Sequence, residues 1–232
     1  MSDEVEDSRP MTEAEWEKMM KESDVRAARF GELLETLHED PDCHEKVARE
    51  MGWDHIVDHL EAGKSQVDEP EEAEEGFDEP AFDDDAPESD PFDIDKEGRE
   101  VMQIPAYATC DRVAEQVREA LKPYERTDHS LDEDTSDLIG QAWIGIHIAC
   151  AKISGGHAMG YEDDVLCGNI VNNKRGLEGA RQSIQAFEAL RGKNVIPNAV
   201  IDRLLPMLRE AGKSIVDRIE EMREKVWWDN KE

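Results

Sequence analysis

Two groups of histidine and cysteine side chains are the residues of this sequence best suited to metal chemistry. The first group consists of Cys43, His44, His55 and His59. His55 and His59 are four residues apart and would share one face of a helix, and cysteine and histidine are good zinc ligands. The spacing matches no zinc signature, however, and Asp54 and Asp58 have the same separation. The alternative is therefore an ordinary solvated face of a short helix.

The second group lies further along the chain. A helix that stays regular to residue 157 would place these side chains in one sector: Trp143, His147, Cys150, Ser154 and His157. The sector overlaps the apolar stripe, so His147 and His157 would be partly buried, where they could bind a metal or a small ligand. The segment has no Glu-x-x-His motif of the di-iron bundles, and a core histidine beside a reduced cysteine is the simpler interpretation.

Two asparagines extend this second group. Asn173 falls on a core-facing position, and a buried asparagine often fixes the register of packed helices at some cost in stability. The alternative is a polar pocket that Asn169 and Asn173 line together with His147 and His157. Nearby glycines and alanines allow either close helix packing or space for a ligand, so the composition does not separate the two hypotheses.

Signatures of catalysis are otherwise missing from the sequence. It has no glycine-rich phosphate loop, no nucleophile elbow and no set of protein-kinase motifs. The glycines of SGGHAMG, residues 154–160, follow an expected helix rather than a strand. We therefore expect no catalytic residues and no cofactor, and favour a protein that is not an enzyme.

Four amphipathic segments must position these side chains: residues 106–124, a segment from about 134 that Gly155 and Gly156 weaken or end, residues 163–191 and residues 197–226. In the third segment Ile170, Leu177 and Ile184 are seven residues apart, which is typical of a coiled-coil-like seam. Pro206 should kink or break the fourth segment. Helices of this length with short connections predict an all-α, up-down-up-down four-helix bundle over residues 99–232.

Two stretches of these segments carry a resemblance to a known family. The sequences GLEGARQSIQAFEAL and DRLLPMLREAGKSI resemble the small four-helix-bundle proteins encoded within ribosomal-RNA intervening sequences. The resemblance implies the bundle fold and assigns no role to any residue.

The N-terminal part is expected to be helical over residues 11–63, after a disordered tail at residues 1–10. Apolar residues from Trp16 to Leu37 have helical spacing, with an expected interruption at Ser23 and Asp24. A second helix should follow Asp40 as its N-cap, and a third should run from Asp54 to Leu60. About 50 residues are a marginal size for an independent domain.

Acidic residues are concentrated in one stretch. The chain of 232 residues has a formal net charge of −31, and residues 68–95 contain 15 acids, four prolines and no lysine or arginine. Such a composition cannot bury enough apolar surface to fold, so we expect an acidic disordered linker at residues 64–98. Phe77, Phe82 and Phe92 lie within it, and either dock into a protein partner or are incidental to a solubilising spacer.

The charge also limits the partners. An acidic chain disfavours non-specific binding to nucleic acid or to an anionic membrane, and no apolar run is long enough to span a bilayer.

The four separated cysteines suggest no disulfide framework and are compatible with a reducing cytoplasm. Trp227 and Trp228 either pack at a junction or form an exposed anchor for a partner.

Together these features predict a non-enzymatic cytoplasmic interaction or regulatory protein. It would bind a protein partner, with a basic partner favoured by charge, through the acidic segment and its aromatic residues. A homo-oligomer is compatible with the sequence. The alternative is a ligand- or metal-binding bundle that uses the second histidine and cysteine group.

Overall fold

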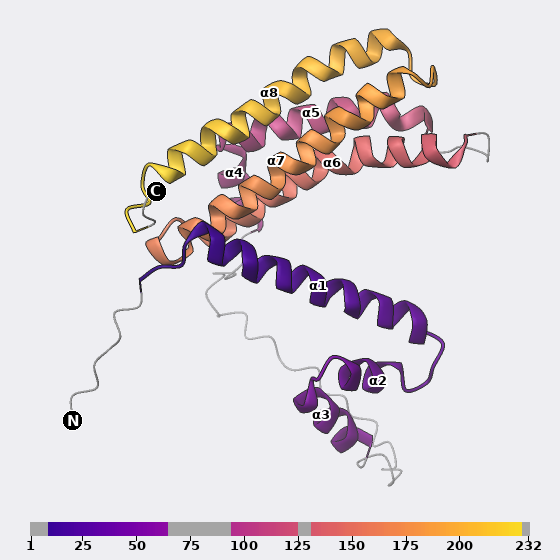
Figure 1. Cartoon of the computed structure of the whole chain (residues 1–232), viewed down its shortest axis with the longest axis vertical. Coiled ribbons are helices and arrows are strands. Elements are labelled where there is room, and N and C mark those ends of the chain that lie inside the picture. Colours follow the sequence, from indigo (N-terminus) through magenta and orange to yellow (C-terminus); the bar gives the residue numbers. More distant parts are fainter. Residues whose placement is uncertain (1–8, 65–93, 125–130, 229–232) are drawn as a thin grey trace, which may run out of the picture. The chain divides into compact units, whose positions relative to one another are not determined.

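The computed structural model describes residues 9–64, 94–124 and 131–228. All regular secondary structure in these ranges is helical, which confirms the predicted all-α class (Figure 1). The α-helices are α1 (Glu13–Leu37), α2 (Cys43–Glu50), α3 (Asp54–Lys64), α4 (Ile94–Met102), α5 (Pro105–Leu121), α6 (Glu133–Met159), α7 (Asp163–Arg191) and α8 (Asn198–Arg223). A short 3-10 helix, Lys122–Tyr124, extends α5. The described residues form two compact units, one of residues 9–17 and 94–228, the other of residues 18–64.

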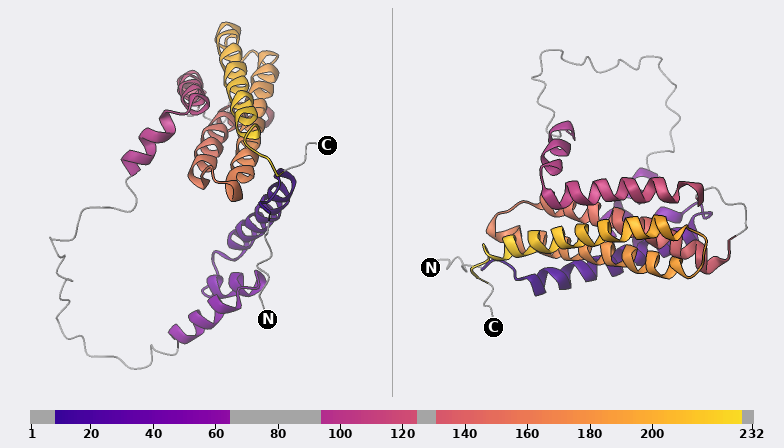
Figure 2. Two further views of the ribbon diagram at one scale, coloured as in Figure 1. Left: turned by 90° about the vertical axis from the view of Figure 1, so that its left-hand side faces the viewer. Right: turned by 90° about the horizontal axis from the view of Figure 1, so that it is seen from above.

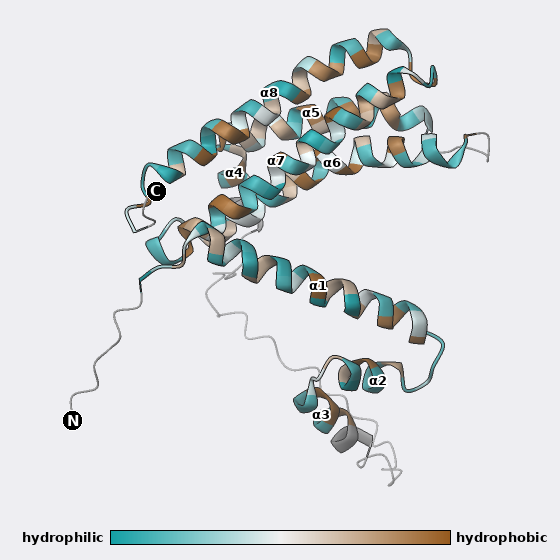
Figure 3. Cartoon of the chain, viewed as in Figure 1, coloured by the Kyte–Doolittle hydropathy of each residue, from teal (hydrophilic) through white to brown (hydrophobic). Residues whose placement is uncertain are grey.

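Helices α5 to α8 form the predicted helical bundle. Each helix packs against the next, and α5 also packs against α8, so the neighbours have the cyclic order expected for an up-down-up-down bundle. The right-hand view of Figure 2 shows the helices side by side, and Figure 3 shows hydrophilic and hydrophobic residues along each of them. The largest fully buried core side chains include Phe187, Leu121, Ile146, Ile153, Leu166, Ile170, Leu190, Ile201, Leu204, Leu208 and Ile215.

The predicted seam on α7 lies against this core. Ile170 is fully buried, whereas Leu177 and Ile184 are half-buried and pack against the core. The companion positions Asn173 and Ala180 are also fully buried. The seven-residue spacing therefore identified the inward face of α7.

Helix α6 does not end at Gly155 and Gly156, contrary to the expectation from their low helix propensity. It continues to Met159 and stops at Gly160, whose φ of 104° lies in a region that residues with a Cβ rarely adopt. A glycine in a helix interior costs about 1 kcal/mol relative to alanine. The close packing of α6 on α7 at several glycines offsets this cost.

The approach of α6 to α7 is closest at Gly145 and Gly179. A Cβ on Gly145 would lie 2.5 Å from the carbonyl oxygen of Gly179, and a Cβ on Gly179 would lie 2.6 Å from that of Gly145. The Ser183 hydroxyl, which is buried, donates a hydrogen bond of 2.6 Å to the carbonyl oxygen of Ala142. The two backbones thus touch where only glycine leaves room.

Helix α8 runs through Pro206 without a break. Proline has no N–H to donate to the carbonyl four residues earlier, which belongs to Asp202. Pro206 is exposed, so water can reach this side of the helix.

A surface hollow of about 360 Å³ lies beside Pro206, lined by Glu188, Arg191, Asp202, Leu205, Pro206 and Arg209. Its charges are paired across the two helices, Arg191 with Asp202 and Arg209 with Glu188.

Helix α4 begins inside the range that was expected to be linker. Residues 94–98 are helical, and the chain that follows is anchored by Val101 and Ile104, which are buried in the bundle core. A few apolar residues among many charges were enough to hold the helix on the bundle, which the charge count alone did not reveal. The rest of the expected linker, including Phe77, Phe82 and Phe92, lies outside the described residues.

The second unit consists of residue 18 onward of α1, with α2 and α3. Helix α1 has no interruption at Ser23 and Asp24, and none of its residues is buried. Within this unit the rings of Phe30 and Trp53 lie 5.4 Å apart, and Arg29 donates to the carbonyl oxygen of Glu50. Its buried residues are Cys43, Val47, Ala48 and Val57, a core as small as the segment length indicated.

Among the described residues, none of the helices combines the length and the apolar character needed to cross a lipid bilayer.

Candidate functional site

A network of polar side chains connects the turn between α6 and α7 to α8. Its innermost members are Asn169 and Asn173, both fully buried. The Asn169 amide donates to the carbonyl oxygen of Gly160 at 2.9 Å, and the Asn173 amide donates to the main-chain and side-chain oxygens of Asn169, each at 2.9 Å. These bonds fix the orientation of both amides, because only the nitrogen of each side chain can donate.

The outer members are Arg218, Tyr161 and His157. Arg218 donates from Nε to the side-chain oxygen of Asn173 at 3.1 Å and from Nη2 to the Tyr161 hydroxyl at 2.8 Å. The same hydroxyl lies 2.8 Å from Nδ1 of His157. Arginine only donates, so the Tyr161 oxygen accepts from Arg218 and its own proton is free to point to Nδ1 of a neutral His157. We call these five residues the Asn–Arg–Tyr–His network.

Gly156 makes room for this network. A Cβ on Gly156 would lie 2.6 Å from the side-chain oxygen of Asn169 and 3.1 Å from the side-chain nitrogen of Asn173. A Cβ on the adjacent Gly155 would meet nothing within 4 Å. Of the two consecutive glycines, only Gly156 is required by the packing.

Of the second candidate group and the two asparagines that extend it, the structure joins His157, Asn169 and Asn173 in this network. His147 and Cys150 lie elsewhere. His147 is half-buried, its Nδ1 donates to the carbonyl oxygen of Trp143 at 2.8 Å, and the two rings lie 4.4 Å apart. Cys150 makes its contacts on the α5 side, and burial raises the pKa of Cys150 and of Cys110 to about 12. Thiols with so high a pKa remain protonated and weakly nucleophilic at neutral pH.

Arg218 and Tyr161 were not predicted from the sequence. Arg218 is 45 residues from Asn173 and 57 residues from Tyr161 along the chain. No periodicity in a single sequence joins positions so far apart. The signal in the sequence was the core-facing register of Asn173, because a buried amide requires polar partners.

The first candidate group lies in the second unit, on α2 and α3. Cys43 is buried, whereas His44, His55 and His59 are exposed. The described part of the chain contains no group of three or more histidine, cysteine, aspartate or glutamate side chains placed to hold a metal ion. The four residues are therefore not brought together as one ligand set.

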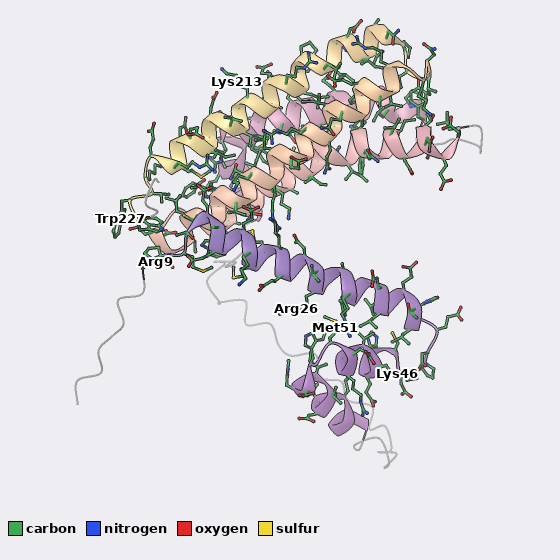
Figure 4. All side chains as sticks on the ribbon, in the orientation of Figure 1. Arg9, Arg26, Lys46, Met51, Lys213 and Trp227 are labelled. Atoms are coloured by element: carbon green, nitrogen blue, oxygen red, sulfur yellow. The ribbon has the colours of Figure 1, made fainter. Side chains whose placement is uncertain are left out.

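The two C-terminal tryptophans have different surroundings. Trp228 is 8% exposed, and its Nε1 donates to the carbonyl oxygen of Met11 at 3.3 Å. Trp227, labelled in Figure 4, is 72% exposed, and its Nε1 donates to the carboxylate of Asp163 at 3.0 Å. One tryptophan thus packs inside the bundle unit, while the other presents its ring to solvent.

Residues 9–17, here called the N-terminal arm, bind the same end of the bundle. Glu13 forms a bidentate pair with Arg223, both bonds being 2.7 Å, and Lys174 lies 3.2 Å from the carboxylate of Glu17. The Trp16 ring packs so closely on Gly168 that a Cβ there would lie 3.0 Å from it. Trp16 Nε1 is buried and has no hydrogen-bond partner among the described residues.

The ionised state of Glu13 holds the arm in place. Burial opposes ionisation, but the hydrogen bonds and charge of Arg223, together with the charge of Lys174, outweigh it and keep the pKa of Glu13 below its usual value. A carboxylate with a lowered pKa stabilises the folded state above its unfolded pKa, and this stabilisation is lost as the pH falls through the folded pKa. Docking of the arm should therefore weaken in acid.

We expect Glu13→Gln and Arg223→Met to be coupled in their effects on stability. At pH 7 a double-mutant cycle should give a coupling energy of about 1–3 kcal/mol, because the pair is bidentate and partly buried. The measurement is chemical unfolding of the four proteins of the cycle. The coupling should shrink as the pH is lowered below the usual range of glutamate, and Arg209→Met with Glu188→Gln, an exposed pair, serves as the control. A coupling no larger than that of the control pair would contradict the role of the arm contact.

Comparisons with known proteins give no relative for this chain: no family model, no curated protein and no solved structure matches it.

Proposed function

We propose that this chain is a non-enzymatic cytoplasmic interaction protein that binds a protein partner, preferably a basic one, through its acidic segment. The observation that carries the proposal is the concentration of 15 acids without any lysine or arginine in residues 68–95. Such a segment attracts a basic surface over a long range and accelerates the encounter. Phe77, Phe82 and Phe92 would add apolar contacts once the two proteins meet, since aromatic residues often dominate interface energies.

The attachment of the segment supports the same function. Its C-terminal end leads directly into α4, and Val101 at the end of α4 and Ile104 just after it are buried in the bundle core. A partner bound to the acidic segment would therefore stay close to the folded bundle, to which the segment is attached. Trp227, whose side chain is exposed, offers a second aromatic contact.

The test is quantitative capture of partners by the full chain over a series of salt concentrations. A variant that lacks residues 65–92 keeps α4 and should lose salt-sensitive partners. The triple variant in which Phe77, Phe82 and Phe92 are replaced by alanine keeps the wild-type charge. It therefore separates the aromatic contribution to binding from the electrostatic one. It should weaken binding at all salt concentrations without changing the salt dependence, because the charges remain. If the deletion variant retained every partner at low salt, the proposal would be wrong.

A further inference from the structure

The hydroxyl of Tyr161 is held in an arrangement that activates a phenol. It lies 2.8 Å from Nδ1 of His157 and 2.8 Å from Nη2 of Arg218. The tyrosine occupies the turn between α6 and α7 and is 39% exposed, so a reagent can approach it from solvent. The function proposed above does not use this site.

Each neighbour supplies one requirement of nucleophilic attack by a phenol. The hydroxyl must lose its proton as it reacts, and a neutral imidazole nitrogen within hydrogen-bond distance can accept it. The oxygen develops negative charge before the new bond is complete, and the guanidinium of Arg218 stabilises that charge. The oxygen keeps a second lone pair for the electrophile, since only one is engaged by Arg218.

Arg218 is fixed in this position by side chains that make no contact with the hydroxyl. Its Nε is bound by Asn173, which is bound in turn by Asn169, and both asparagines are fully buried. A donor that is already oriented needs no rearrangement when charge develops. If the two buried amides served only to hold the turn, the arrangement would be costly, because each buried amide must be fully hydrogen-bonded.

The surroundings favour a phosphorus electrophile. Nη1 of Arg218 makes no hydrogen bond to any residue in the described ranges, so it can bind an oxygen of an incoming phosphoryl group. Helix α7 begins at Asp163, and its N-terminus favours negative charge, part of which Asp163 and Asp164 of its first turn already supply. The carboxylate of Glu162 accepts from the Tyr161 N–H, and that of Asp163 accepts from Nε1 of Trp227.

We propose that Tyr161 is a nucleophilic acceptor site for phosphoryl groups. In the step, a bond forms between the Tyr161 oxygen and phosphorus, the bond from phosphorus to its leaving group breaks, and the phenolic proton passes to Nδ1 of His157. The leaving group departs with the electron pair of the broken bond. The reagents are phosphorus compounds with a good leaving group, and nucleoside triphosphates are biological members of this class. The product places a phosphate ester beside Arg218.

The probe for this reaction is diisopropyl fluorophosphate, whose leaving group is fluoride. The full chain is treated at pH 7, digested, and the labelling rate of each tyrosine is followed by mass spectrometry. Tyr107 and Tyr124 are internal controls: burial raises the pKa of Tyr107, and the Tyr124 hydroxyl donates to the carbonyl oxygen of Val195 at 2.9 Å. Tyr161 should be labelled at least about ten-fold faster than either control tyrosine.

Two variants test the assigned roles, each with a matched control. His157→Asn keeps a polar atom near the hydroxyl but cannot take its proton, and Arg218→Met removes the cation. Each should slow labelling of Tyr161 by about ten-fold or more, whereas His147→Asn and Arg203→Met, on the same two helices, should leave it unchanged. The His157→Asn rate should rise in proportion to hydroxide concentration, while the wild-type rate at pH 7 should depend less on pH.

These outcomes decide the proposal even if one variant is less stable. Circular dichroism shows whether each variant is folded at the labelling temperature, and the wild-type comparison among three tyrosines needs no variant. If Tyr161 reacted no faster than Tyr124 in the wild-type chain, the proposal would be overturned. An unchanged rate and pH profile in folded His157→Asn would likewise remove the role of His157 as the base.

Discussion

Gly145→Ala should destabilise the bundle by about 2–3 kcal/mol, at the upper end of what overpacking usually costs. The added methyl group would lie 2.5 Å from the carbonyl oxygen of Gly179 and 2.8 Å from the backbone nitrogen of Ser183. Both are main-chain atoms, so neither can rotate away, and α6 and α7 must separate. Separation would also strain the buried bond from Ser183 to Ala142. Thermal unfolding should show a Tm lower by about 5–10 °C.

The control for this substitution is on the same helix. Gly140 is in the interior of α6, and a Cβ there would meet nothing within 4 Å. Gly140→Ala should therefore raise stability by about 0.5–1 kcal/mol, because alanine restricts the unfolded chain and favours the helix. If both alanine variants were stabilised, the close approach of α6 to α7 at Gly145 would be incorrect.

Asn173→Ala should cost about 2–4 kcal/mol of unfolding free energy. The substitution leaves the Asn169 side-chain oxygen and Nε of Arg218 without the partner that each has in the wild type. An unsatisfied buried polar group costs about 1–3 kcal/mol, and two groups are affected here. Chemical unfolding of the full chain, followed by circular dichroism, measures the loss.

Asn172→Ala is the matched control for this second prediction. Asn172 is half-buried, and among the described residues its amide donates to a weak acceptor alone, the sulfur of Met159, at 3.0 Å. Its removal should change stability by less than about 1 kcal/mol. Arg218→Met should be less costly in the Asn173→Ala background than in the wild type, because one of the two partners of Arg218 is already gone. Strictly additive losses would show that the network does not act as a unit.

The structural features behind these two expected losses of stability were only partly predictable from the sequence. The core-facing register of Asn173 was correctly predicted from the repeat on α7, and the residue is fully buried. Its partners could not be predicted, because Arg218 lies on another helix and Tyr161 lies in a turn. The expected end of α6 at Gly155 and Gly156 failed for a related reason. Helix propensity describes an isolated helix, whereas the packing of α7 makes glycine the suitable residue at 156.

In the N-terminal part, too, local structure was predicted from the sequence and long-range contacts were not. The helical periodicity from Trp16 to Leu37 predicted α1, although the helix is continuous where an interruption was expected. The local pattern did not assign residues 9–17 to the bundle unit. That assignment depends on Glu13 and Arg223, which are 210 residues apart. Of the two alternatives expected for the C-terminal tryptophans, packing applies to Trp228, which is buried, and exposure applies to Trp227.

The sequence by itself determined the all-α class, the positions of the bundle helices within a few residues, the inward face of α7 and the location of the acidic segment. These are local properties, because periodicity, charge runs and helix signals are read over a few turns of chain. Only the tertiary structure decided which polar residues meet at the turn between α6 and α7, which glycines are required, and which end of the bundle the N-terminal arm binds. Those features depend on contacts between helices, and their partners are separated by tens to hundreds of residues.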